Sequence, residues 1–111
     1  PCTWLALLDG ELCGSVILVY DDLPGWPASD PWLASFLVAP HHRRHGIGAR
    51  LLATALAHAD AQGYPRLLLF TEAAAAYFAR AGFVVCGSLT AGGHAVSVMS
   101  RLHPAQGAAS T

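Results

Sequence analysis

Apolar runs separated by turn residues predict a hairpin and a third strand in the first part of the chain. In segment 3–22, two apolar runs flank Asp9-Gly10, a dipeptide suited to the positive φ angles of a type I′ turn. Segment 23–31 carries three prolines and a glycine, so it predicts a loop. The apolar run 32–39 predicts the third strand, which Pro40 ends because proline has no N–H to donate to a sheet ladder.

The middle of the chain predicts two helices with a strand between them. From Gly46 to about Gln62, apolar residues recur every three or four positions, which predicts an amphipathic helix that Gly63 terminates. The continuous apolar run 66–71 predicts a short strand buried on both faces. The alanine-rich segment 72–82 predicts a second, shorter helix. The apolar positions of the first helix are Ile47, Leu51, Leu52, Ala55, Leu56 and Ala59.

The last part of the chain predicts a closing hairpin, with strands at 83–89 and 95–102 and turn residues between them. A single domain is therefore expected over 1–103, followed by a flexible small-residue tail at 104–111. The order β-β-β-α-β-α-β-β places antiparallel hairpins at both ends, and its strand-helix-strand crossover implies one parallel pair. The predicted fold class is α/β, with a mixed, mostly antiparallel sheet around a central β-α-β crossover.

Composition supports a folded domain and excludes several function classes. Because 54% of the residues are hydrophobic and 12% are charged, the chain can bury a core. A formal net charge of −1 gives no global attraction to nucleic acid or a membrane surface. No apolar run approaches the ~20 residues that span a bilayer. The three cysteines are odd in number and lack C-x-x-C spacing, which favours reduced thiols in a cytoplasmic protein.

The most unusual chemistry lies in VAPHHRRHGIGARLL, residues 38–52. Two glycines that open a helix after a strand suggest anion binding, because the first helical turn has unpaired N–H groups and the positive end of the helix dipole. The absence of lysine excludes a GxxxxGK[ST] P-loop, and Leu51 stands where a dinucleotide-binding fingerprint needs its third glycine. The histidines of this stretch have no cysteine or carboxylate near them and form no obvious tetrahedral set, so no metal is expected.

The run Arg43-Arg44-His45-Gly46-Ile47-Gly48 matches the pattern R-x-x-G-x-G. With SFLVAP before it and ARLL after it, this run resembles the acyl-CoA-binding loop of the GNAT superfamily of N-acyltransferases. The segment LLLFTEAAAAYFARAGF is similar in spacing to the family pattern A-x-x-(F/Y)-Y-x-x-x-G-F, and AVSVMSRL resembles the last strand of many members. The resemblance covers residues 3–103. A typical member begins with a further strand and two helices, so it implies a domain that is short at its N-terminal end.

The resemblance implies how acetyl-CoA would bind. The backbone of the strand segment 36–38 would pair with the pantetheine arm and polarise the thioester carbonyl. The backbone N–H groups of 44–49 would hold the pyrophosphate, and the arginines would supply charge around it. The implied binding residues are Phe36, Leu37, Val38, Arg43, Arg44, His45, Gly46, Ile47, Gly48, Ala49, Thr71 and Phe78.

The acid and the base of the reaction are undefined in this sequence. Family members protonate the departing thiolate with a tyrosine at the position of Phe78, which has no hydroxyl. Tyr77 is the adjacent candidate, but neighbouring helical residues point roughly 100° apart, so we expect Tyr77 to face the core. Asp30 is a candidate for relaying a proton through water, with a solvated loop aspartate as the simpler interpretation.

The resulting hypothesis is an acetyl-CoA-dependent N-acetyltransferase. A primary amine of a small molecule or peptide would attack the thioester directly, without a covalent acyl-enzyme. The alternative is a non-catalytic acyl-CoA-binding or interaction module that keeps the fold and has lost the proton donor; Phe78 favours it. We expect no nucleic acid or membrane partner, and a homodimer stays open.

Overall fold

Six strands form one mixed sheet in the computed structural model, which describes residues 2–20, 30–39 and 46–104. In chain order the elements are β1 (Cys2–Leu8), β2 (Glu11–Val19), β3 (Trp32–Val38), α1 (Ile47–Ala61), β4 (Arg66–Thr71), α2 (Ala75–Ala79), β5 (Val84–Ala91) and β6 (His94–Leu102). The strands lie across the sheet in the order β1-β2-β3-β4-β6-β5. All neighbours are antiparallel except β3 and β4, so the predicted fold class with its central crossover is confirmed.

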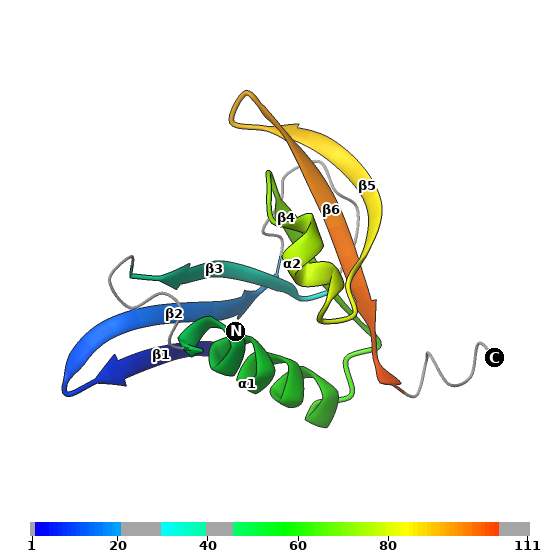
Figure 1. Ribbon diagram of the computed structural model, residues 1–111. Coiled ribbons are helices and arrows are strands. Elements are labelled where there is room, and N and C mark those ends of the chain that lie inside the picture. Colours follow the sequence, from blue (N-terminus) through cyan, green and yellow to red (C-terminus); the bar gives the residue numbers. More distant parts are fainter. Residues whose placement is uncertain (1, 21–29, 40–45, 105–111) are drawn as a thin grey trace.

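The sheet divides into two arms that diverge like a V (Figure 1). The strands β1, β2 and β3 form one arm with α1 against them, and β4, β6 and β5 form the other with α2 beside them. The arms meet at the parallel pair of Trp32 and Leu68, where the N–H of Leu68 donates to the carbonyl of Pro31 over 3.0 Å. Because Trp32 begins β3, the rest of that strand runs away from β4.

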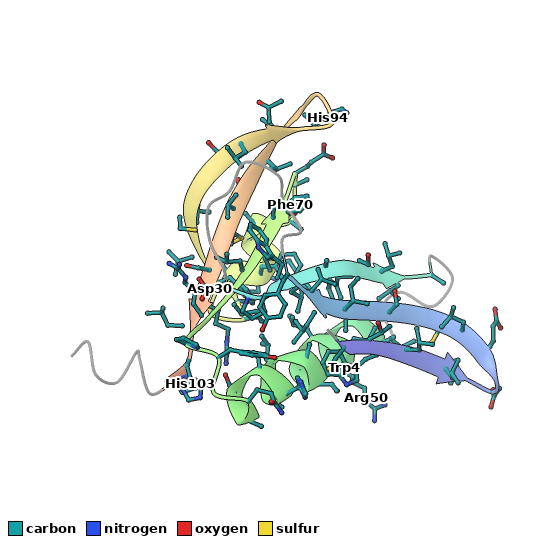
Figure 2. All side chains as sticks on the ribbon, turned by 180° about the vertical axis from the view of Figure 1, so that it is seen from behind. Trp4, Asp30, Arg50, Phe70, His94 and His103 are labelled. Carbon is teal, nitrogen blue, oxygen red and sulfur yellow. The ribbon has the colours of Figure 1, made fainter. Side chains whose placement is uncertain are left out.

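Apolar residues pack on both faces of the sheet. The larger cluster joins the buried face of α1 to both arms, and Trp4 points from β1 toward this helix (Figure 2). The smaller cluster contains Trp32, Leu68, Val96 and Val98. Leu67 and Leu69 belong to the first cluster and Leu68 to the second, which confirms that β4 is buried on both faces.

The turns of the first hairpin and of the long helix follow the sequence prediction. Asp9 and Gly10 both have positive φ angles, 51° and 80°, as the type I′ turn requires. The helix α1 begins after Gly46, which is left-handed at φ 75°, and it ends at Ala61, followed by its C-cap Gln62 and by Gly63 at φ 74°. Glycine reaches both conformations without a steric penalty.

Two predicted boundaries are wrong. The second helix, expected over 72–82, is limited to Ala75–Ala79, because the Thr71 hydroxyl accepts the N–H of Ala74 over 3.0 Å and turns the chain before the helix can begin. The last hairpin has a shorter turn than predicted. Gly92 and Gly93 adopt φ angles of 58° and 81°, so the strands continue to within two residues of each other.

Three parts of the sequence prediction lie outside the described residues: most of the proline-rich loop, the segment 40–45 and the tail 105–111. Within the described ranges, no helix is long and apolar enough to cross a membrane.

Candidate active site

A cleft of about 560 Å³ opens where β3 and β4 diverge. One wall comes from β3 and the start of α1, and the other comes from the end of β4 and from α2. The lining residues are Leu33, Ala34, Ser35, Phe36, Val38, Gly48, Leu69, Phe70, Thr71, Ala74, Tyr77 and Phe78. The cleft is therefore mainly apolar, with three side-chain hydroxyls among its described residues, on Ser35, Thr71 and Tyr77.

A bulge in β3 shapes the first wall. Ser15 pairs with Leu37 and Ile17 pairs with Ala34, so β3 has one residue more than β2 across this interval. Ser35 lies in the bulge at φ 48°, a conformation that non-glycine residues rarely adopt, and the Ser15 hydroxyl donates to its carbonyl over 3.1 Å. Bulges bend a strand and re-aim its groups. Here the bulge lies in the part of β3 that lines the cleft, beyond the position that pairs with β4.

The backbone of β3 presents hydrogen-bonding groups to the cleft side. The N–H of Ala39 donates to Cys13 on β2 over 2.8 Å. Because successive backbone groups of a strand point to opposite sides, those of Val38 and Phe36 point away from β2 and toward the cleft. The side chain of Leu37 is 65% exposed and is not among the residues that line the cleft, and its backbone pairs with Ser15 on β2.

The start of α1 is open on the cleft side. The first intrahelical bond there joins the N–H of Arg50 to the carbonyl of Gly46, which leaves the N–H groups of Ile47, Gly48 and Ala49 ahead of the helical ladder. Among the residues that the structure describes, no side chain caps this end, and its first turn carries no acidic residue. At Gly48 a Cβ would stand 3.4 Å from Phe36 Cζ and from Val38 Cγ2, so this glycine keeps the passage between helix and cleft clear.

The expected orientation of Tyr77 is wrong. Its side chain is 40% exposed and lines the cleft, and its hydroxyl lies 3.5 Å from the position of a Cβ on Gly48. Phe78 is 7% exposed and packs against Phe36 and Phe83, with ring centroids 5.7 and 6.0 Å away. The 100° rotation between the two residues is real, but it is Phe78 that turns to the core. Both residues line the cleft, but Tyr77 is the exposed one, with its hydroxyl beside Gly48, whereas the ring of Phe78 is buried.

Asp30 lies apart from the cleft. Both Nε and Nη2 of Arg66 donate to its Oδ2, over 2.9 and 2.7 Å, at the base of the V (Figure 2). Cys86 is exposed on β5 and is not among the residues that line the cleft. Thr71 does line it, at the end of β4.

Two further implied binding residues, Ile47 and Ala49, lie on α1 and are not among the residues that line the cleft. Ile47 packs toward β1, and Ala49 lies on the face of α1 that turns to Tyr77 and Arg80. Arg43, Arg44 and His45 lie outside the described residues, as do His41 and His42.

Six lining residues were missed in the sequence: Leu33, Ala34, Ser35, Leu69, Phe70 and Ala74. Leu69 and Phe70 have a signal, because they share the end of a predicted strand with Thr71. Ser35 has no such signal, because no local sequence pattern predicts that a serine will adopt a positive φ.

Solved structures with the same fold are acetyltransferases. N-acetylglutamate synthase from Neisseria gonorrhoeae, complexed with coenzyme A and N-acetyl-glutamate, is 23% identical with a TM-score of 0.74. A nourseothricin acetyltransferase is 33% identical with a TM-score of 0.70. A putative streptothricin acetyltransferase from Bacillus anthracis, in complex with acetyl coenzyme A, is 22% identical with a TM-score of 0.72. These matches cover 91%, 86% and 90% of this chain, respectively, and show that it has the fold of these acetyltransferases.

The chain belongs to the acetyltransferase (GNAT) family, whose model matches residues 1–83. The resemblance found in the sequence is thereby confirmed. The chain spans 25% of the length of the N-acetylglutamate synthase and 61% of each of the other two proteins. A search among curated proteins gave no match.

Proposed function

We propose that the protein transfers an acetyl group from acetyl-CoA to a primary amine by direct attack on the thioester. The observation that carries this proposal is the cleft between β3 and β4, into which the open start of α1 leads. Family membership and the coenzyme A named with two of the related structures support the same ligand.

The described residues fit a diphosphate at the start of α1. Apart from its chain neighbours, no described residue has an atom within 4 Å of a Cβ on Gly46, and at Gly48 the absent side chain leaves space beside Phe36 and Val38. The N–H groups of Ile47, Gly48 and Ala49, together with the positive end of the helix dipole, are suited to an anion. Arg43, Arg44 and His45 would add positive charge from the preceding segment.

Bound acetyl-CoA would supply an acyl group already activated as a thioester. The backbone groups of Phe36 would bond the pantetheine arm, and an N–H aimed at the thioester carbonyl would stabilise the charge that develops there, an effect often worth ~3 kcal/mol. Thr71, on the opposite wall, would bound the same arm.

We assign the proton donor to Tyr77. Its hydroxyl is one of the three that line the cleft in which the pantetheine arm and the thioester would lie. No carboxylate of the described residues lines the cleft, so the acceptor amine would enter in its neutral form or lose its proton to water. Positioning of the two reactants supplies much of the rate in such a site.

The acceptor is a primary amine of a small molecule or peptide. N-acetyl-glutamate, named with the N. gonorrhoeae enzyme, carries its acetyl group on nitrogen. We place the activity in the cytoplasm, where the three free cysteines would stay reduced.

A second candidate is a non-catalytic acyl-CoA-binding module. The buried, hydroxyl-free Phe78 at the position of the family's acid favours it. Calorimetry with CoA and a thiol-release assay with acetyl-CoA and a panel of amines separate the two. Transfer requires CoA binding and thiol release that depends on an amine, whereas binding without release favours the module. Absence of CoA binding contradicts both.

A further inference from the structure

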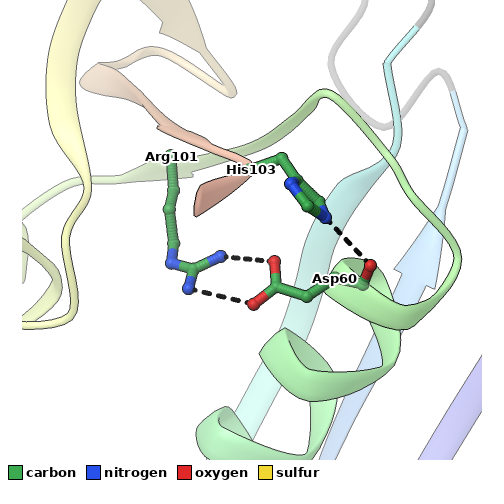
Figure 3. A network of polar contacts seen from close by, with 3 residues as sticks. All are labelled: Asp60, Arg101 and His103. Atoms are coloured by element: carbon green, nitrogen blue, oxygen red, sulfur yellow. Dashed lines mark hydrogen bonds and ion pairs between the residues drawn. The ribbon is translucent and has the colours of Figure 1, made fainter. Parts of the chain in front are cut away.

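Arg101 on β6 joins the ends of the two helices that flank the cleft. Its two terminal nitrogens donate to the two carboxylate oxygens of Asp60, over 3.0 and 3.3 Å, in the last turn of α1 (Figure 3). Its stem lies over Gly82 in the turn after α2, where a Cβ would stand 3.7 Å from Nε and 3.9 Å from Cδ. One side chain therefore lies between the last turn of α1 and the turn that follows α2.

His103 adds a second connection at the same place. Its Nε2 lies 3.0 Å from the backbone carbonyl of Asp60 (Figure 3). Because a carbonyl oxygen can only accept, Nε2 is the donor. The backbone N–H of His103 donates to the carbonyl of Pro65 over 2.9 Å. The end of α1 and its connection to β4 are thus held against the end of β6.

These contacts have a directionality that the apolar part of the junction lacks. The apolar cluster spans both arms, but apolar contacts are non-directional and tolerate small rotations. The arms share the one paired position of Trp32 and Leu68. A bidentate arginine–carboxylate pair fixes orientation as well as distance. Its side chains are 18% and 29% exposed, so water and salt screen it less than an open surface pair.

We infer that Arg101 is a positioning residue for the cleft. By holding the end of α1 to the turn after α2, it sets the separation between Gly48 on the first helix and Tyr77 on the second. This inference rests on the proposed function only where CoA binding is measured, because the separation of the helices is a property of the protein alone.

The chain contains a matched control. Arg66 and Asp30 form another arginine–aspartate pair at the base of the V. That pair joins β4 to the residue before β3 and leaves the two helix ends untouched. R101Q and R66Q therefore remove the same kind of interaction, and only R101Q should alter the helix separation.

The test compares R101Q, R101K, D60N and R66Q with the unmodified chain by ¹H–¹⁵N NMR and by calorimetric titration with CoA. The Gly48 amide reports the separation, since its Cβ position lies within 3.5 Å of Phe36 and Tyr77, whose ring currents shift nearby resonances. We expect R101Q to move the Gly48 and Tyr77 amides and to raise the Kd for CoA about tenfold or more, since misplacement by 1 Å can cost ~10²-fold. R101K keeps the charge and should recover part of both effects, and R66Q should show neither.

The inference is overturned if R101Q leaves the Gly48 and Tyr77 resonances in place, or if R66Q moves them as far. If R101Q fails to fold, the Gly48 and Tyr77 resonances of D60N provide the same test. If the unmodified chain binds no CoA, the proposed function fails, while resonance shifts confined to R101Q and D60N still support the positioning role.

Discussion

The Tyr77 hydroxyl faces Gly48 across the mouth of the cleft, 3.5 Å from where a Cβ on that glycine would stand. The two residues come from different helices on different arms of the sheet. Their meeting point is where the open start of α1 leads into the cleft. Substitutions of Tyr77 and of Gly48 test the two residues separately.

Tyr77→Phe should lower the turnover number by about 10²-fold or more, because it removes the proposed proton donor. CoA affinity should stay at the wild-type value, since the ring keeps its packing against Phe36 and Phe78. Thiol release and calorimetry measure the two quantities. Wild-type turnover in this variant would assign proton donation elsewhere.

Phe78→Tyr is the control for that assignment. It adds a hydroxyl to a ring that is 7% exposed, so it should lower the free energy of unfolding by ~1–3 kcal/mol. Turnover should not rise. A gain in turnover would return the role of acid to position 78.

Gly48→Ala should raise the stability of the domain and lower its affinity for CoA. Replacing glycine inside a helix by alanine stabilises it by up to ~1 kcal/mol, and the new Cβ would make contacts of 3.4–3.5 Å without overlap. The same methyl group narrows the passage to the cleft, so CoA affinity should fall about tenfold, or ~1.4 kcal/mol. Urea unfolding and calorimetry measure the two effects.

Ala57→Gly is the reciprocal control for this substitution, since Ala57 is exposed on α1 and does not line the cleft. It should lose stability and keep CoA affinity. Equal CoA affinity in Gly48→Ala and the unmodified chain would contradict the position of the ligand.

Ser35→Val should destabilise the domain by ~1–3 kcal/mol, because a β-branched residue fits poorly at φ 48°. Since the bulge also directs β3 at the cleft, the variant should weaken CoA binding. Ser35→Gly relaxes the same backbone and should keep both properties. Thermal unfolding with and without CoA distinguishes these outcomes, and equal behaviour of the two variants would show that the bulge imposes no backbone constraint.

Asp30→Asn should leave turnover unchanged, since the carboxylate is bonded to Arg66 at the base of the V, away from the cleft. Loss of a pair this close to the surface costs about 0–1 kcal/mol of stability. A pH–rate profile is the check: a profile that changes in Asp30→Asn would restore Asp30 as a proton relay.

The long elements could be predicted because their patterns are strong. Period-3.6 apolar positions marked α1, and continuous apolar residues marked β4, whose burial on two faces leaves no alternation. The short helix was harder. Alanine content favours a helix throughout 72–82, but propensity is a weak force beside the hydroxyl of Thr71, which fixes a turn before it.

The cleft itself could be predicted only in part. Gly46 and Gly48 could be identified from the sequence, because two glycines at the start of a helix after a strand are typical of an anion-binding site. The orientation of the Tyr77 side chain could not be predicted, because a five-residue helix has too little periodicity to show which face is buried. The divergence of the arms depends on the bulge at Ser35, whose conformation comes from pairing with β2, a contact distant in sequence.

The most direct measurement is a ¹H–¹⁵N NMR titration of the chain with CoA. A diphosphate held by the start of α1 predicts large, saturable shifts of the Ile47, Gly48 and Ala49 amides, accompanied by Phe36 and Val38 on β3. Inorganic sulfate, as a smaller anion, should move the helix amides but not those of β3. Saturable binding of CoA with these five amides unmoved would contradict the assignment of the site.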